Sequence, residues 1–157
     1  MAFRGRRCSD FAFTLVELMV AVTILLTLAT MALPVARLKI KRDKEMELRR
    51  DLREMRTAID RYKDAADKGL IAIEADTEGY PPDLQTLVDG VPLAGKPDRR
   101  VRFLRHIPAD PFTNTADWGL RSVQDRGDSR SWGGQNVFDV YSRSAGTALD
   151  GTRYADW

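Results

Sequence analysis

Several chemistries are missing from this sequence of 157 residues. It has one cysteine, Cys8, which excludes a disulfide within the chain, and one histidine, His106. It contains no phosphate-binding glycine loop, no zinc-ligand spacing and no dinucleotide fingerprint. The formal charge is only +2, and the excess lies in residues 1–12, which argues against nucleic acid as a partner.

Isolated reactive side chains add little to the case for catalysis. His106 stands alone on a predicted strand, and neither Ser142 nor Asp139 has a second histidine near it in the sequence. A general base must lie within hydrogen-bond reach of its partner, so we expect no enzyme. Cys8 precedes the apolar run of the chain instead of following it, as a lipoprotein cysteine would, and we interpret it as incidental.

One long apolar run, residues 13–36, dominates what is present. Its sequence is FTLVELMVAVTILLTLATMALPVA, and Glu17 is its only formal charge. A run of this length can cross a bilayer as a helix. Because it follows a leader with three arginines, it is a secretory signal, a membrane anchor, or each in turn. A weak cleavage site among residues 32–36 keeps ordinary export open.

Glu17 needs an explanation, because a carboxylate near the start of an apolar helix costs about 2 to 3 kcal/mol at membrane depth. Such a residue usually marks a partner or a function, although Glu17 could simply sit at the interface. If the chain is cut before Phe13, the new amino group of one subunit is a positive charge that Glu17 of a neighbour can neutralise. That pairing would fix the stagger between subunits, and a head-to-tail contact of this kind grows an open filament.

The helical pattern continues beyond the apolar run. Apolar residues recur at alternating steps of four and three, which is one continuous stripe. They are Leu48, Leu52, Met55, Ile59, Tyr62 and Ala66. The repeat is too short to require a coiled coil, so we expect the stripe to pack on a sheet of the same chain, and we interpret charged neighbours such as Glu45 and Arg49 as a solvated surface. With an end near Gly69 and a bend at Pro34, this predicts one helix of about 55 residues.

The remainder of the chain predicts a small head. Residues 82–88 indicate a short second helix, because proline is well placed early in a helix. Strands are expected over residues 101–107, 118–123 and 137–142, turns at 89–90 and 95–98, and a polar loop over 124–135. The expected fold class is α+β: a long N-terminal helix, transmembrane in one half and amphipathic in the other, packed on a small antiparallel sheet of about three strands.

The start of the apolar run resembles the processing site of type IV pilin-like proteins, the class III prepilins. The residues that carry the resemblance are Ala12 through Glu17, AFTLVE, with Pro34 late in the run. It implies that a prepilin peptidase cuts between Ala12 and Phe13, that the amino group of Phe13 is methylated, and that the apolar run is retained. The family usually has glycine where this chain has Ala12, and alanine is small enough to fit.

Three phrases in the head are similar to the G-type major pseudopilin of type II secretion systems. They are GYPPDLQTLVDG at residues 79–90, RFLRHIPADPFTN at residues 102–114 and FDVYS at residues 138–142, followed by a tail that ends in Trp157. The resemblance implies a subunit that polymerises into a pseudopilus and drives protein export across the outer membrane. Its energy would come from a separate cytoplasmic ATPase.

The same resemblance implies an organisation, a location and a set of partners. The chain would have a cleaved leader at residues 1–12, a transmembrane and filament-core helix at residues 13–36, and a periplasmic head at residues 37–157. It would be held in the bacterial inner membrane until assembly. The expected partners are other copies of the chain, the prepilin peptidase, the inner-membrane assembly platform, minor pseudopilins and membrane lipid.

Two other functions stay open from the sequence. A type IV pilus pilin, used for adhesion, motility or DNA uptake, would share the processing and the filament. A membrane-anchored periplasmic binding domain would keep an uncut amino terminus and would not polymerise. The state of the mature amino terminus therefore separates the second alternative from the pilin-like functions.

Calcium is the one cofactor that the resemblance implies. In the G-type family, loops after the middle strand hold the ion with acidic side chains and backbone carbonyls, near a tail rich in glycine and aspartate. Here Gly146 and Thr147 stand where an early acidic residue is expected, which leaves Asp150 and Asp156 as candidate ligands. The alternative is an Asp-Gly turn at residues 150–151, followed by Trp157 packed on the head.

Overall fold

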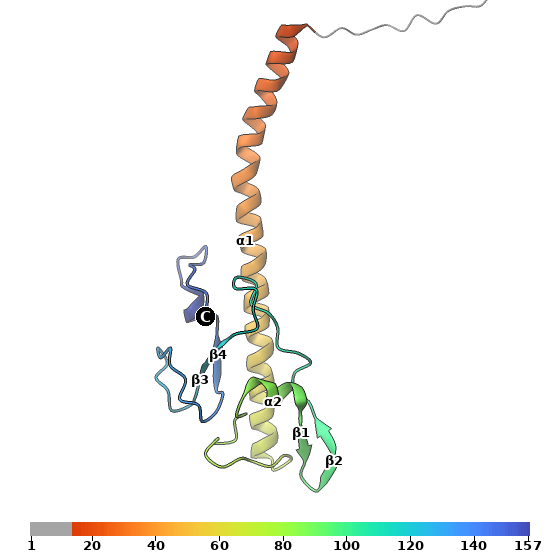
Figure 1. Cartoon of the computed structure of the whole chain (residues 1–157), viewed down its shortest axis with the longest axis vertical. Helices are drawn as coiled ribbons and strands as arrows, with labels where there is room; N and C mark the ends of the chain where they lie inside the picture. The colour runs from red at the N-terminus through yellow and green to blue at the C-terminus, as the bar shows by residue number, and fades with distance from the viewer. Residues whose placement is uncertain (1–13) are drawn as a thin grey trace, which may run out of the picture. The chain divides into compact units, whose positions relative to one another are not determined.

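The computed structural model describes residues 14–157, except for the side chains of residues 31–33. The chain divides into two compact units, Met1–Ile40 and Lys41–Trp157. Along the described residues, one long helix is followed by a short helix, short strands and a terminal 3-10 turn (Figure 1). Ala12 and Phe13, the predicted processing residues, lie outside the described residues.

The long helix α1 (Leu15–Asp67) has 53 residues, which confirms the predicted helix of about that length. Its end is closed at Gly69, which adopts the left-handed backbone conformation with φ of 65°. The Gly69 amide donates to the carbonyl of Ala66 and the Leu70 amide to that of Ala65, both at 2.9 Å. Pro34 lies inside α1, and the bend expected there stays a prediction.

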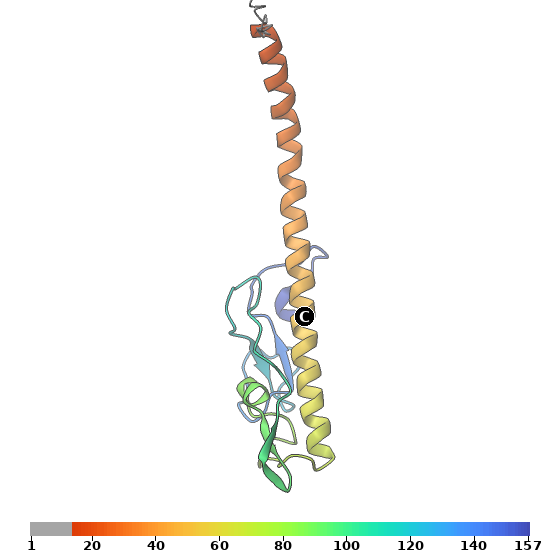
Figure 2. The ribbon, with the colours of Figure 1, turned by 90° about the vertical axis from the view of Figure 1, so that its right-hand side faces the viewer.

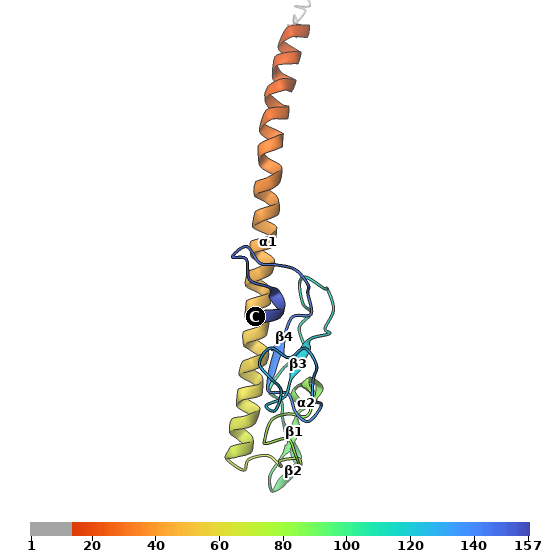
Figure 3. The ribbon, with the colours of Figure 1, turned by 90° about the vertical axis from the view of Figure 1, so that its left-hand side faces the viewer.

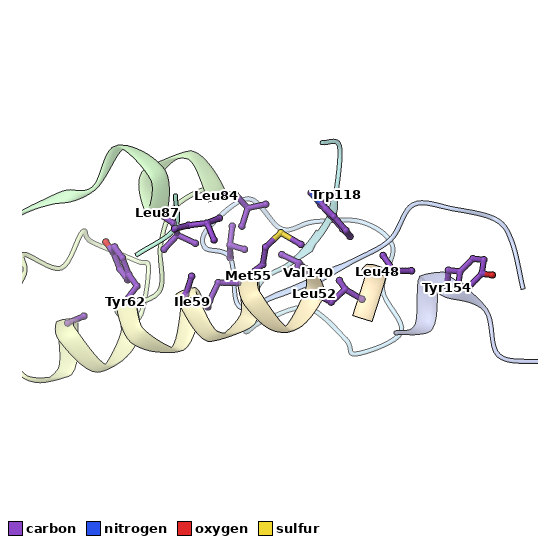
Figure 4. Packing of buried hydrophobic residues seen from close by; sticks show 14 of the residues in the cluster. Leu48, Leu52, Met55, Ile59, Tyr62, Leu84, Leu87, Trp118, Val140 and Tyr154 are labelled. Carbon is purple, nitrogen blue, oxygen red and sulfur yellow. The ribbon is translucent and has the colours of Figure 1, made fainter. Parts of the chain in front are cut away.

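The amphipathic stripe of α1 forms the core of the Lys41–Trp157 unit. All six residues predicted for the stripe are buried, and none is more than 3% exposed. They pack against residues from the rest of the head, among them Leu87, Trp118 and Val140 (Figure 4). Each fully buried side chain of this size contributes roughly 1.5 to 3 kcal/mol of transfer free energy, so the stripe is the main apolar contribution of α1 to the head.

The short helix α2 (Leu84–Asp89) confirms the predicted second helix, with a later start. Asp83 occupies the capping position, because its backbone is extended and its side chain accepts a hydrogen bond from the Thr86 amide at 2.7 Å. Leu84 and Leu87 face the core at 7% and 0% exposure. Gly90 ends the helix with φ of 76°, a conformation that favours glycine.

The strands form two antiparallel pairs. Strand β1 (Val91–Leu93) pairs with β2 (Lys96–Val101), and β3 (Gly119–Arg121) pairs with β4 (Asp139–Tyr141). Within the Lys41–Trp157 unit, α2 and the strands lie along one side of α1 (Figures 2 and 3). The fold is therefore the expected pilin-like α+β arrangement, with a long helix packed on small antiparallel strands.

The strand predicted over residues 101–107 is wrong, because the strand ends at Val101. Gly95, with φ of 75°, allows a tight hairpin that places the charged residues before Val101 in β2. After β2 the amides of Phe103 and Leu104 both donate to the carbonyl of Leu87 at 3.0 Å, which replaces strand pairing. Side chains in this segment do not alternate between buried and exposed as in a strand, since the adjacent Phe103 and Leu104 are partly buried and buried, respectively.

Candidate functional site

The first turn of α1 is organised around Thr14 and Glu17. The Thr14 hydroxyl oxygen accepts a hydrogen bond from the Glu17 amide at 3.2 Å, and the Thr14 carbonyl accepts from the Leu18 amide at 3.1 Å. Thr14 therefore caps the helix. Glu17 stands in the first turn, where the helix dipole favours a negative charge, and its side chain is exposed. No ion-pair partner of Glu17 is found among residues 14–157.

The apolar part of α1 in the Met1–Ile40 unit has no covering within that unit. Every described side chain from Leu15 to Ile40 is exposed, with Leu15 at 70%, Leu25 at 65% and Val35 at 67%. A helix that is apolar on all sides belongs in a membrane or among other helices. Of the helices among the described residues, α1 alone is long and apolar enough to cross a bilayer.

Polar side chains within this apolar part satisfy their hydrogen bonds locally. The hydroxyl of Thr23 donates to the carbonyl of Met19 at 2.7 Å, and that of Thr27 donates to Ile24 at 2.7 Å. Thr30 donates to the carbonyl of Thr27 at 2.8 Å. Such back-bonding lets hydroxyls sit in an apolar environment without an outside partner. Glu17 is the one charged side chain in residues 14–36.

The candidate calcium ligands are both engaged by other groups. Asp150 accepts hydrogen bonds from the amide and hydroxyl of Thr152 at 2.9 and 2.6 Å, and it pairs with Arg49 at 3.1 Å. These bonds from Thr152, with a smaller contribution from Arg49, hold the pKa of Asp150 below its usual range. Asp156 forms two hydrogen bonds with the guanidinium of Arg153, at 2.9 and 3.0 Å.

This arrangement does not fit a calcium ion. Calcium takes six to eight oxygen ligands, whereas no cluster of three or more acidic, histidine or cysteine side chains suited to a metal occurs among the described residues. A cation at either Asp150 or Asp156 would also have to displace a guanidinium that already neutralises the carboxylate. The structure confirms the alternative turn, since Gly151 has φ of 88° and its amide donates to the Ala148 carbonyl at 3.1 Å.

Ser142 and Asp139, two of the reactive residues named in the sequence, make contacts that support the fold. Ser142 is buried and donates its hydroxyl to the buried carboxylate of Asp110. Asp139 pairs with Arg56 at 2.7 Å and with Arg121 at 3.1 Å. His106 is exposed on the segment after β2. Ser142 and Asp139 thus hold β4 in place, through separate contacts.

A basic cavity of about 520 Å³ lies between α1 and the segment after β2. Arg53, Arg61 and Arg105 line it, together with Phe103 and Leu104. Its full lining contains neither histidine nor cysteine.

Sequence reasoning missed the polar contacts that tie α1 to the tail. Glu45, predicted as part of a solvated surface, is only 9% exposed and accepts hydrogen bonds from the Tyr154 hydroxyl and the Leu149 amide. Arg56 donates to the main-chain oxygen of Trp157. The i, i+4 spacing of Glu45 and Arg49 suggested only a pair within the helix, because partners about 100 residues away leave no local pattern.

Comparison with known proteins matches residues 8–33 to the prokaryotic N-terminal methylation motif. No curated protein and no solved structure matches the chain. The matched range includes the predicted cleavage point at Ala12 and Phe13, and it includes Glu17. The motif is that of type IV pilin-like prepilins, which are structural and generally not enzymes, and it implies processing by a prepilin peptidase.

Proposed function

We propose that this chain, which carries the N-terminal methylation motif of type IV pilin-like prepilins, is a structural subunit of a type II secretion pseudopilus. The observation that carries the proposal is the apolar part of α1, residues 15–36, whose described side chains are all exposed and most of which lies within the matched motif. The subunit is held in the inner membrane by this helix, with its head in the periplasm, and polymerises to drive protein export across the outer membrane.

An uncovered apolar helix has two stable surroundings. Lipid can cover it before assembly, and the corresponding helices of neighbouring subunits can cover it afterwards. Burial of apolar surface is worth about 25 cal/mol per Å² relative to water, but moving a helix from lipid to a helix bundle gains little from this effect. The transfer therefore needs a specific interaction in addition to apolar packing.

Glu17 supplies that interaction in our proposal. Peptidase cleavage before Phe13 frees an amino group, which stays positively charged after methylation. The Glu17 carboxylate of an adjacent subunit pairs with this group, so two costly charges in an apolar environment become one neutral pair. The pair fixes the axial position of one subunit against the next, and repetition of one head-to-tail contact gives an open helical filament.

The pseudopilus is proposed in preference to a surface pilus because phrases of the head are similar to the G-type pseudopilin. The phrases at residues 79–90 and 102–114 that are similar to the G-type pseudopilin contribute Leu87 and Leu104 to the core, which is packed on the stripe of α1. The assembly platform, minor pseudopilins and prepilin peptidase are the partners that follow from this assignment. A surface pilin and an anchored binding domain are retained as outcomes of the experiment.

The test is co-expression of the full chain with a prepilin peptidase, followed by intact-mass analysis and negative-stain microscopy. We expect a mature chain that begins at methylated Phe13 and forms filaments. The Glu17→Ala variant should be inserted into the membrane and cut, yet should form fewer than about a tenth of the wild-type filaments, because an unpaired amino group in the bundle costs several kcal/mol. Glu47→Ala is the matched control, since Glu47 is an exposed glutamate of α1 within the head.

Three results would redirect the proposal. Wild-type filament numbers in Glu17→Ala would remove the charge pairing from the assembly. An uncut amino terminus would favour the anchored periplasmic binding domain. Processed chains that form filaments on the cell surface, without any loss of protein export when the gene is deleted, would favour the type IV pilus.

A further inference from the structure

Four side chains on one face of α1 hold the tail of the head. Lys41, Glu45, Arg49 and Arg56, which we call the tail clamp, all contact main-chain or side-chain groups of residues 147–157. The spacing of four residues between the first three places them on one side of the helix, and Arg56 follows two turns later on the same side. Figure 3 shows the terminal turn η1 (Tyr154–Asp156) beside α1 in this region.

The first half of the tail clamp, Lys41 and Glu45, binds residues 147, 149 and 154 of the tail. The Lys41 ammonium donates to the Thr147 carbonyl at 2.7 Å. One carboxylate oxygen of Glu45 accepts from the Leu149 amide at 2.9 Å and from the Tyr154 hydroxyl at 3.0 Å. Because Glu45 and Tyr154 are both buried, these bonds form with little competition from water.

The second half of the tail clamp consists of two guanidinium groups. Arg49 pairs with Asp150 at 3.1 Å and lies over the Trp157 ring at 4.1 Å from its centroid. Arg56 donates to the main-chain oxygen of Trp157 at 2.6 Å and to that of Val140 at 2.9 Å. Arg56 also pairs with Asp139, so a single side chain joins α1, β4 and the last residue.

We propose that the tail clamp closes the tail of this head without a divalent cation, in the place where the G-type resemblance implies calcium. The two carboxylates that a metal would need, Asp150 and Asp156, are neutralised by Arg49 and Arg153. The guanidinium groups of Arg49 on α1 and Arg153 in the tail thus neutralise the two carboxylates that a bound ion would otherwise neutralise. The tail clamp belongs to the folded head, and its contacts do not depend on filament assembly.

The test is hydrogen exchange by mass spectrometry on the full chain in detergent, over peptides that cover residues 147–157. Arg49→Met should speed exchange of the tail several-fold, since its ion pair is exposed and weak. Arg56→Met should speed it about tenfold or more, because it removes charged hydrogen bonds to three acceptors that are partly buried. Arg53→Met is the matched control, because Arg53 lines the basic cavity and no bond to the tail is found for it among the described residues.

Calcium supplies the second arm of the experiment. Exchange in the tail and the melting temperature of the wild-type chain should be the same with millimolar calcium and with excess chelator. Slower exchange or a higher melting temperature with calcium would overturn the proposal, and so would wild-type exchange of the tail in Arg49→Met and Arg56→Met. If Arg56→Met fails to fold, the more exposed Arg49→Met still decides the question.

Discussion

Tyr154 joins the tail to α1 and packs on two other aromatic rings. Its hydroxyl donates to Glu45, and its ring stacks on Phe112 at 4.1 Å between centroids and meets Trp157 edge to face at 5.1 Å. Two aromatic neighbours and one hydrogen bond to a carboxylate fix both the plane and the direction of the phenol. A change at this hydroxyl therefore reports on the contact between tail and helix.

We expect stability at alkaline pH to depend on this hydroxyl. Burial, together with the hydrogen bond to Glu45, raises the pKa of Tyr154 to about 12 from the ordinary value of 10.0. The folded state thus favours the protonated phenol, so the contribution is fully present below pH 10 and is lost as the pH rises toward 12. The measurement is the midpoint of urea unfolding of the full chain in detergent, followed by tryptophan fluorescence from pH 8 upward.

The control for this prediction is Tyr154→Phe, which keeps the ring and removes the proton. At neutral pH it should lower the free energy of unfolding by about 1.5 to 3 kcal/mol, because one buried hydrogen bond to a carboxylate is lost. It should also lose stability less steeply than wild type between pH 10 and 12. Equal pH slopes in the two proteins would contradict the assignment of the raised pKa to Tyr154.

At the scale of the element, two of the methionines of α1, Met46 and Met55, have opposite surroundings. Met55 is fully buried in the stripe, whereas Met46 is 57% exposed. Met55→Ala should therefore lower the free energy of unfolding by roughly 2 to 5 kcal/mol, because it leaves a cavity in the core. Met46→Ala should lower it by less than about 0.5 kcal/mol. Urea unfolding of both variants tests this, and equal costs would contradict the packing of the stripe on the head.

The same helix shows how far sequence reasoning reaches. The stripe from Leu48 to Ala66 was predictable because its period reports directly on which face is buried. The contacts of Glu45 and Arg56 were not, because they depend on tail residues that folding alone brings near. The strand β2 was misplaced for a related reason. Its charged residues lack an apolar alternation, and pairing with β1 across the Gly95 turn decides its position.

The candidate site divides in the same way between local and distant information. Glu17 and the apolar run could be identified from the sequence, because an acid in such a run is unusual whatever the fold. The neutralisation of Asp150 by Arg49 could not, since the two residues are separated by about 100 positions. The candidate calcium ligands were therefore named from the resemblance and their residue type, and their engagement by arginines became visible only in the fold.

At the scale of the whole molecule, the two units have different requirements. The Met1–Ile40 unit holds the motif and the exposed apolar helix, whereas every buried residue of the hydrophobic core comes from the Lys41–Trp157 unit. Among the described residues, the apolar part of α1 therefore contributes no side chain to the hydrophobic core. Folding of the head and assembly of the filament should then be separable by truncation.

A fragment of residues 41–157 should fold by itself and remain monomeric in water. It keeps the stripe, both strand pairs and the tail clamp, and it loses the apolar surface that drives association. Circular dichroism should show a cooperative thermal transition, and light scattering should give the mass of one chain. Because Glu17 is absent from it, the fragment should also fail to form filaments or to join those of the full chain. A fragment that is unfolded would show that the head needs the first unit for stability, and one that polymerises would place the assembly contacts in the head instead of the helix.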